Sequence, residues 1–397
     1  MHRNIRLLTW FNFCLDFRVY NAVAVVYFEQ VTHSWALAGL VLAIAKIASA
    51  AFDVPTGLVS DMLNRKVTLV FGQIASIAAV ACYALGSSFA LLALGAVFEG
   101  LSFALFSGNN DALLFETLKA EDKAALFAEY QGRLSAMFQF ALAASALVAT
   151  LALLAQLSFR ALFWISVAPQ LLGALLALGL VEPIRPAGIE THMGRHMRDA
   201  IAAFRADPRL RTMSLASIIG FGLGEAKFLT LPAFFALFWP AWALGIARLL
   251  SHLLGGTGFR AAGGLIRRFG PGRVLIAGTP IAMGFGISAV LAANAASPGL
   301  YASASLAFGP AAVAQASLMQ ECFTDRQRAT MASLVSFAGA LFMALVVFLL
   351  GVLADRIGVR YALLTVEILS ISVPYLYWRL FGRRVERTGI EDQASQG

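Results

Sequence analysis

Charged residues are scarce in this chain. They make up 13% of its 397 residues, whereas 59% are hydrophobic, and a soluble domain carries roughly twice that share of charge. The mean hydropathy of +0.77 leaves too little polar surface to cover so many apolar side chains. This composition excludes a soluble globular enzyme, a disordered chain and a collagen-like fibre. It indicates a protein whose solvent is lipid.

Cysteines and clusters of metal ligands are sparse as well. The three cysteines, Cys14, Cys82 and Cys322, form no C-x-x-C pair, so the sequence signals neither a zinc site nor a redox pair. His192 and His196 lie four residues apart in a polar stretch, and we interpret them as solvated side chains rather than metal ligands. No Walker-type phosphate loop is present. We therefore expect no metal and no cofactor, with a gradient, such as that of protons, as the energy source.

Long apolar segments account for most of the sequence. About twenty helical residues cross the hydrocarbon core of a bilayer, and such segments must be helical because lipid offers no partner for an unpaired backbone group. The sequence predicts an all-α integral membrane protein with twelve transmembrane helices. We place them at residues 6–29, 35–59, 66–86, 89–117, 130–155, 160–181, 210–238, 241–265, 273–296, 298–320, 329–353 and 361–380.

The basic residues set the orientation of these helices. With the N-terminus inside, most Lys and Arg fall in cytoplasmic segments, whereas Arg160, Arg356 and Arg360 fall outside. The sequence thus predicts a multi-pass protein of the cytoplasmic (inner) membrane with both termini in the cytoplasm. The net charge of +8 follows from this topology, and we expect no nucleic-acid partner.

The longest polar stretch divides the predicted spans six and six. We predict an N-terminal six-helix bundle at residues 1–181, a cytoplasmic linker with an amphipathic helix at 182–209, and a C-terminal six-helix bundle at 210–397. The two halves share a pattern in which Trp-Ala-Leu is followed, about twenty residues later, by a glycine-led loop. It begins at Trp35 in the first half and at Trp242 in the second. Parallel repeats of six helices are a transporter design.

The loop after the second span carries a motif. Gly57, Asp61, Arg65 and Lys66 match the pattern G-x-L-x-D-R-x-G-R-K that joins helices 2 and 3 in the major facilitator superfamily, although Met62 and Asn64 depart from it. A further copy lies at residues 351–360, and residues 107–116 are similar to a pattern of bacterial members. The chain therefore resembles this family, including its drug-efflux-type proton-coupled transporters. The resemblance implies two six-helix bundles related by a pseudo-two-fold axis.

We expect the motif to form a conformational latch on the cytoplasmic side. Gly57 would let helix 2 approach a neighbour closely, Asp61 would cap a helix N-terminus, and Arg65 would pair with a carboxylate. The alternative is that Arg65 and Lys66 only follow the positive-inside rule. The predicted latch residues are Gly57, Asp61, Arg65, Lys66, Asp111 and Glu116.

Charges inside the spans are costly and therefore indicate function. The resemblance implies that helices 1, 4, 7 and 10 line a cavity and that helices 3, 6, 9 and 12 face lipid, and of the latter four only helix 12 carries a charge in its core, Glu367. Candidate proton-coupling residues are Asp16, Asp53, Glu99 and Glu225. Candidate substrate-binding residues are Arg18, Tyr20, Lys46, Lys227, Arg248 and His252.

Helices 1 and 7 each carry an acid-x-base pattern, at Asp16–Arg18 and at Glu225–Lys227. Residues two apart on a helix point about 200° apart, so we expect a pair across the cavity, such as Asp16 with Lys227. Unrelated snorkelling or pairing with neighbouring helices is the alternative. Glu99 has no basic residue four positions away, and we interpret it as a lone carboxyl that carries a proton or else as a hydrogen-bonded structural group.

These patterns predict a secondary active transporter, and not an enzyme. It would move a small molecule across the membrane by alternating access, with proton-coupled export (antiport) as the leading hypothesis. Helix 5 lacks the G-x-x-x-G-P-x-x-G-G motif of drug antiporters. The alternatives are therefore an importer or facilitator of a small anionic or zwitterionic solute, or a lipid flippase. We expect a monomer whose partners are its small-molecule substrate and membrane lipids.

Overall fold

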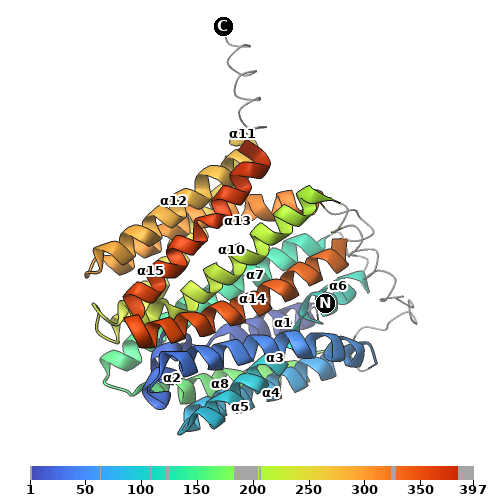
Figure 1. The fold of residues 1–397 in the computed structure, drawn as a ribbon. Coiled ribbons are helices and arrows are strands. Elements are labelled where there is room, and N and C mark those ends of the chain that lie inside the picture. The colour runs from blue at the N-terminus through green and yellow to red at the C-terminus, as the bar shows by residue number, and fades with distance from the viewer. Residues whose placement is uncertain are drawn as a thin grey trace. The chain divides into compact units, whose positions relative to one another are not determined.

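The structure is a computed structural model. It describes residues 2–62, 64–107, 109–120, 123, 126–182, 204, 207–322 and 328–382. Within these ranges the chain is helical and contains no strand (Figure 1). The predicted amphipathic helix of the linker and its two histidines, His192 and His196, fall outside the described residues.

The helices follow one another along the chain with short connections. The first half contains α1 (His2–Asp16), the 3₁₀ helix η1 (Val19–Ala22), α2 (Ala24–Thr32), α3 (Trp35–Met62), α4 (Arg65–Leu85), α5 (Phe89–Phe106), α6 (Asn109–Lys119), α7 (Phe127–Leu154) and α8 (Phe159–Leu178). The second half contains α10 (Pro208–Phe235), α11 (Ala243–Phe269), α12 (Pro271–Ala292), α13 (Ser297–Cys322), α14 (Arg328–Ile357) and α15 (Val359–Ser370). Residues 372–382 continue as a helix after α15. Each of the twelve predicted spans lies mostly in helix, which confirms the all-α membrane fold.

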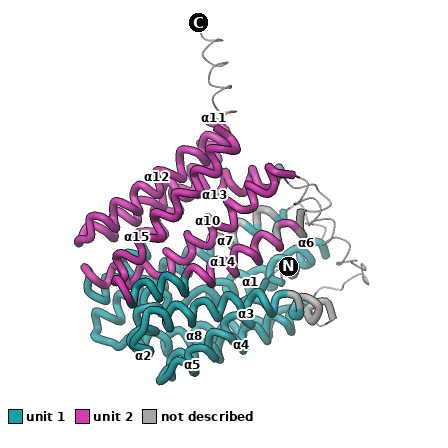
Figure 2. Tube along the Cα trace, in the orientation of Figure 1, with its two compact units in different colours: residues 1–188, 239–249, 347–355 teal, residues 189–238, 250–346, 356–397 magenta. Residues whose placement is uncertain are grey.

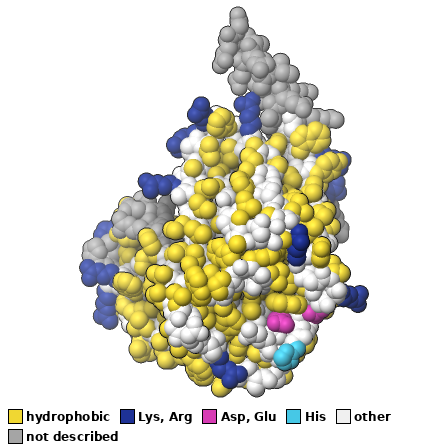
Figure 3. All heavy atoms as spheres, turned by 90° about the vertical axis from the view of Figure 1, so that its left-hand side faces the viewer, with side chains coloured by type: hydrophobic (Ala, Val, Ile, Leu, Met, Phe, Trp, Pro, Cys, Tyr) yellow, Lys and Arg dark blue, Asp and Glu magenta, His cyan; other side chains and the backbone are white. Residues whose placement is uncertain are grey.

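Length and composition identify the membrane-crossing segments. Eight described helical segments are long and apolar enough to span a bilayer. Large apolar side chains are also exposed on them, such as Trp164 and Leu175, which are 48% and 66% exposed. Hydrophobic side chains cover most of the face in Figure 3. A surface of this kind is stable in lipid and not in water.

Local sequence signals place several helix ends. The hydroxyls of Ser88 and Ser158 accept hydrogen bonds from the first turns of α5 and α8, and the carboxylate of Asp207 does so for α10, which begins with a proline. Gly270 and Gly358 adopt φ angles of 78° and 83° before α12 and α15. Because side chains disfavour that conformation, glycine allows the tight turns between these consecutive helices.

The chain forms two compact units (Figure 2). The first consists of residues 1–188 together with the short segments 239–249 and 347–355, and the second contains the remainder. The segments at 239–249 and 347–355 include the first turns of α11 and the last turns of α14, so these helix ends cluster with the first unit. The division into bundles at 1–181 and 210–397 stays a prediction.

Small residues allow close helix packing in the first unit. In α5, a Cβ atom at Gly100 would overlap the backbone of α3 at Ala45, and one at Gly95 would overlap the ring of Tyr83 on α4. Such close approaches are typical of packing between helices in membranes. They bring α3, α4 and α5 together, and α1 packs on α7 and α8 in the same unit.

Two predicted spans are interrupted. The first, predicted as continuous over residues 6–29, stops at Asp16, passes through η1 and resumes at Ala24. The fourth, predicted over 89–117, is divided into α5 and α6 around Ser107. The prediction of one unbroken helix at 6–29 is therefore wrong, because hydropathy measures whether a segment prefers lipid and not whether its backbone is continuous.

Candidate functional site

The break in the first span is held open by side chains of α8. The carboxamide of Gln170 donates to the carbonyl oxygens of Cys14 (3.0 Å) and Leu15 (3.3 Å), and the backbone N–H of Val19 donates to the hydroxyl of Ser166 (2.9 Å). Gln170 and Ser166 are completely buried. They satisfy the backbone groups that the missing helical turn leaves free, and a non-helical backbone at membrane depth requires such partners.

The break places Arg18 and Tyr20 against Glu99 of α5. Nη1 of Arg18 lies 2.6 Å from Oε1 of Glu99, and the hydroxyl of Tyr20 donates to the same oxygen at 3.2 Å. From α4, the hydroxyl of Tyr83 donates to Oε2 at 2.8 Å. Both carboxylate oxygens therefore have partners, as a buried charge requires. We name these four residues, Arg18, Tyr20, Tyr83 and Glu99, the first-unit charge cluster.

This cluster corrects the description of Glu99 as a lone carboxyl. Its partner lies 81 residues away in sequence, so spacing within one helix could not reveal it. Both Arg18 and the candidate Lys46 also lie over the ring of Phe103, at 4.7 Å and 5.2 Å from its centroid. An aromatic face stabilises a nearby cation by electrostatic attraction. Three of the predicted site residues, Arg18, Tyr20 and Glu99, thus meet in one place, and Lys46 lies beside them across Phe103.

A second buried ion pair lies within the second unit. Nζ of Lys227 on α10 lies 2.9 Å from Oε2 of Glu367 on α15, and the hydroxyl of Tyr301 on α13 donates to Oε1 at 3.1 Å. Glu367 is completely buried, and Gly286 of α12 leaves room for its carboxylate. We name Lys227, Tyr301 and Glu367 the second-unit charge cluster.

The second-unit cluster changes two interpretations. The partner of Lys227 is Glu367 and not the expected Asp16. Glu367 itself, which the sequence placed on a lipid-facing helix, lies inside the unit. Sequence reasoning also missed Tyr83 and Tyr301 as carboxylate partners. A charge in the core of an otherwise apolar helix was the signal that could have identified Glu367.

The other candidates of the membrane interior are more dispersed. Asp53 is exposed on α3, Glu225 is half-buried on α10, and Arg248 is 8% exposed on α11. His252 makes an edge-to-face contact with the ring of Phe228, with 6.3 Å between ring centroids. In the described part of the chain, Asp53, Glu225, Arg248 and His252 belong to neither of the two charge clusters.

The predicted cytoplasmic latch is formed in part. Nε of Arg65 lies 2.9 Å from Oε1 of Glu116, and Nη1 of Arg65 donates to Oδ1 of Asn109 at 2.9 Å. The predicted pairing of Arg65 with Glu116 is thus present. The carboxylate of Glu182 caps α4 by accepting from the backbone N–H groups of Arg65 and Lys66. Asp111 accepts from Gln131 instead of Arg65. The side chain of Asp61 and the surroundings of Gly57 lie outside the described part of the chain.

A contact at the other end of α3 resembles a helix cap. The carboxylate of Asp355, in the last turns of α14, accepts from the hydroxyl of Ser34 (2.7 Å) and from the backbone N–H groups of Trp35 (2.6 Å) and Ala36 (2.9 Å). A negative charge at a helix N-terminus is favoured by the free N–H groups and by the helix dipole. Asp355 thus joins the end of α14 to the start of α3 within the first compact unit.

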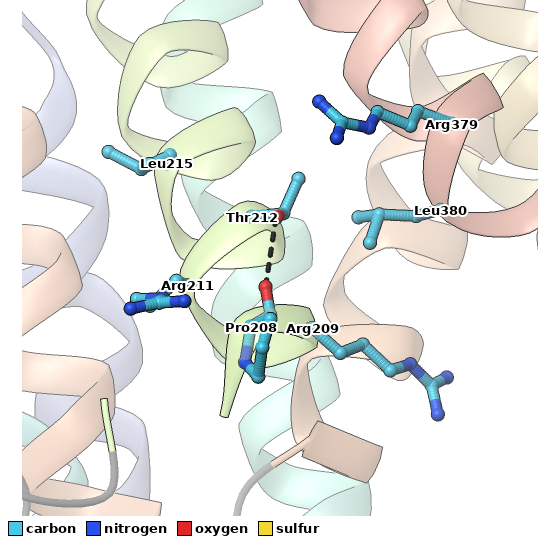
Figure 4. A pocket seen from close by; sticks show the side chains of 7 residues that line it. All are labelled: Pro208, Arg209, Arg211, Thr212, Leu215, Arg379 and Leu380. Atoms are coloured by element: carbon cyan, nitrogen blue, oxygen red, sulfur yellow. Dashed lines mark hydrogen bonds between the residues drawn. The ribbon is translucent and has the colours of Figure 1, made fainter. Parts of the chain in front are cut away.

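Each unit contains a cavity lined by described residues. A cavity of about 250 Å³ in the first unit is lined by Asn12, Asp16, Phe106, Asn110, Asp111, Gln131, Leu134 and Phe138. A cavity of about 560 Å³ lies in the second unit (Figure 4). Its side chains Arg209, Arg211 and Arg379 extend in different directions and do not converge on one point. Such a basic cluster at helix ends is what the positive-inside rule predicts.

Buried charge clusters within a bundle of apolar helices, one of them at a broken span, are typical of integral membrane transporters. A family model described as Major Facilitator Superfamily matches residues 7–345. The chain therefore belongs to the major facilitator superfamily.

Solved structures share the fold over nearly all of the chain. The nucleoside transporter NupG matches with a TM-score of 0.79 and 14% identity, covering 96% of this chain and 99% of its own. A bacterial homolog of the human lysosomal transporter Spinster, inward-facing and unoccupied, matches with a TM-score of 0.76 and 17% identity (95% and 96% covered). A D-xylose-proton symporter matches with a TM-score of 0.75 and 14% identity (95% and 97% covered). No curated protein gives a significant match.

Proposed function

We propose that this transporter exports a small molecule in exchange for protons, and that Glu99 carries the proton. The observation that carries the proposal is the first-unit charge cluster, because it places an ionisable pair at a broken membrane span. That the fold neighbour for D-xylose is a proton symporter supports proton use by this architecture.

The chemistry of the cluster gives protonation a structural consequence. The carboxylate of Glu99 accepts hydrogen bonds from the guanidinium of Arg18 and from the hydroxyls of Tyr20 and Tyr83. A proton on Glu99 removes the countercharge of Arg18, which is only 5% exposed, and a buried charge without a partner is costly. Arg18 then needs another carboxylate, and Asp16 lies two residues away along the chain.

Such an exchange of partners can change the conformation of the break. Arg18 connects α5 to the residues between α1 and η1, and Nε of Arg18 also donates to the carbonyl of Leu15 (3.1 Å). A shift of the guanidinium from Glu99 to Asp16 therefore alters hydrogen bonds of the backbone itself. Proton binding would then bias one of two arrangements of the first span, which is the requirement for coupling.

The contacts of Arg65 with Glu116 and of Asp355 with the start of α3 support alternating access. The contact of Asp355 lies at the start of α3, and that of Arg65 lies at the start of α4, which follows the end of α3. We propose that each contact is made while its side of the membrane is closed. The candidates Asp53, Glu225, Lys46, Lys227, Arg248 and His252 remain our proposals for secondary proton or substrate contacts. We also propose residence in the cytoplasmic membrane as a monomer, with both termini inside.

Reconstitution tests the proposal. Proteoliposomes would enclose the pH-sensitive dye pyranine and receive cationic, zwitterionic, anionic or uncharged solutes in turn. We expect one class to provoke proton movement with wild-type protein and with Glu29→Gln, a control that removes a carboxylate of the same unit outside the charge cluster. Glu99→Gln should abolish this movement. Solute transport without proton movement in the wild type would contradict the proposal.

A further inference from the structure

The cavity of the first unit has a distinctive lining. It lies between α1, α6 and α7, with Asn12 and Asp16 from α1, Asn110 and Asp111 from α6, and Gln131 from α7. Its volume of about 250 Å³ equals roughly eight water molecules in the liquid. Five polar side chains thus face a space large enough for a small solute.

Hydrogen bonds fix which way its carboxamides point. Nδ2 of Asn12 donates to the carbonyl of Leu8 (2.8 Å), so its Oδ1 is the acceptor for Nδ2 of Asn110 (3.0 Å). Because Nδ2 of Asn110 is the donor in this bond, Oδ1 is the polar atom of that carboxamide that takes no part in it. Nε2 of Gln131 donates to Oδ1 of Asp111 (2.9 Å), and because a carboxylate only accepts, Oε1 of Gln131 is the remaining atom there.

Both remaining amide oxygens are buried, and neither has a hydrogen-bond partner among the described residues. Buried polar atoms ordinarily have one, so each asks for a donor. The two carboxylates of the cavity, Asp16 and Asp111, are acceptors as well, and they add negative charge. The described side chains of this site therefore call for hydrogen-bond donors and positive charge.

The apolar side of the cavity completes the description. Phe106, Leu134 and Phe138 line it beside the polar groups. Methylene groups of a solute could pack on these side chains, while N–H groups meet the oxygens. An anion would be repelled by the two carboxylates. A quaternary ammonium ion would supply charge but no donor for the two amide oxygens.

We propose that this cavity binds a small organic cation with several N–H donors, a guanidinium or primary ammonium group on a short aliphatic chain. The inference deepens the proposed function and rests on it, since it names the chemical class of the exported solute. It also favours a cationic solute over the anionic or zwitterionic one considered from the sequence.

Asp16 links this cavity to the proton site. While Glu99 is charged it holds Arg18, and Asp16 is available to the cation. A proton on Glu99 releases Arg18, whose guanidinium then neutralises Asp16 and displaces the cation. The groups that face Glu99 in this exchange are Arg18, Tyr20 and Tyr83. Cation and proton therefore compete through one arginine, which is the thermodynamic basis of exchange.

Calorimetric titration of the full chain in lipid nanodiscs, without any gradient, tests the inference. The probes are agmatine, choline as a cation without N–H donors, and succinate as an anion. We expect saturable binding of agmatine, binding of choline weaker by at least tenfold, and none of succinate. Asp16→Asn and Asp111→Asn should each weaken agmatine binding by at least tenfold, whereas Glu29→Gln should bind as wild type does.

A second measurement keeps the test decisive if either cavity variant fails to fold. Phe138→Cys, in a chain whose native cysteines are replaced by alanine, places a thiol at the cavity wall, and agmatine should slow its reaction with a maleimide severalfold. The inference would be overturned if agmatine left the labelling rate unchanged or if Asp16→Asn bound agmatine with the affinity of the wild type. Binding of choline or succinate that is tighter than that of agmatine would also overturn it. Absent agmatine binding with intact solute-driven proton movement would refute the substrate class alone. Agmatine binding without any proton movement would refute the proposed exchange and leave the class standing.

Discussion

Arg18 and Glu99 form an ion pair of 2.6 Å at the point where the first membrane span is broken. The backbone at Arg18 is extended rather than helical, and from this conformation its guanidinium reaches Glu99 of α5. An irregular backbone, a buried charge and a candidate proton site therefore occur together at this pair.

The first prediction concerns the stability of this pair. Glu99→Met removes the countercharge of Arg18. Removing one partner of a buried pair costs about 3–5 kcal/mol, and a new contact of Arg18 with Asp16 would offset part of this loss. The double variant Arg18→Met with Glu99→Met removes both charges and should recover most of that loss. Chemical denaturation or thermal melting of the purified protein in detergent measures both. A double variant that is less stable than Glu99→Met would contradict the assignment of the pair.

The second-unit charge cluster predicts a similar asymmetry. Lys227→Met should destabilise the protein by about 3–5 kcal/mol, because Glu367 is completely buried and would keep only the bond from Tyr301. Phe228→Leu, at the next position of α10, serves as a control for packing. Thermal melting compares the two variants. Equal stability of Lys227→Met and the wild type would show that the pair contributes nothing.

A kinetic effect is expected at the cytoplasmic latch. Arg65 and Glu116 are both partly exposed, so their pair contributes little to folding, but it must break and form in each transport cycle under our proposal. Arg65→Ala should therefore lower the transport rate at least tenfold with little change in melting temperature. Lys119→Ala, an exposed basic residue of α6, is the matched control. Equal rates for the two variants would favour the simpler view that Arg65 only follows the positive-inside rule.

The opposite end of α3 gives a further prediction. Asp355→Asn weakens the three hydrogen bonds that the carboxylate accepts at the start of α3, because an amide is a poorer acceptor for a helix N-terminus than a charged carboxylate. We expect a thiol introduced at Ser34 to react severalfold faster with a membrane-impermeant maleimide in this variant. The comparison uses Ser34→Cys alone and Ser34→Cys with Asp355→Asn. An unchanged rate would mean that Asp355 does not help to close that end.

The sequence predicted the membrane fold well because hydropathy depends on local composition. The twelve helical segments, the family and the pair of Arg65 with Glu116 all follow from short stretches of residues. The break after Asp16 did not, since it depends on Gln170 and Ser166, which are distant in sequence and not unusual on their own helix. The partners of Glu99 and Lys227 escaped prediction for the same reason. Charge type was visible in the sequence, but its pairing depends on how helices pack.

The measurement that tests the account most directly is solute-driven proton movement in proteoliposomes, compared between wild type and Glu99→Gln. The account predicts that wild type moves protons against the solute. It also predicts that Glu99→Gln, in which the loss of the carboxylate leaves Arg18 to neutralise Asp16, moves no protons. Solute transport that proceeds at the same rate with and without a pH gradient in the wild type, or proton movement that persists in Glu99→Gln, would contradict it.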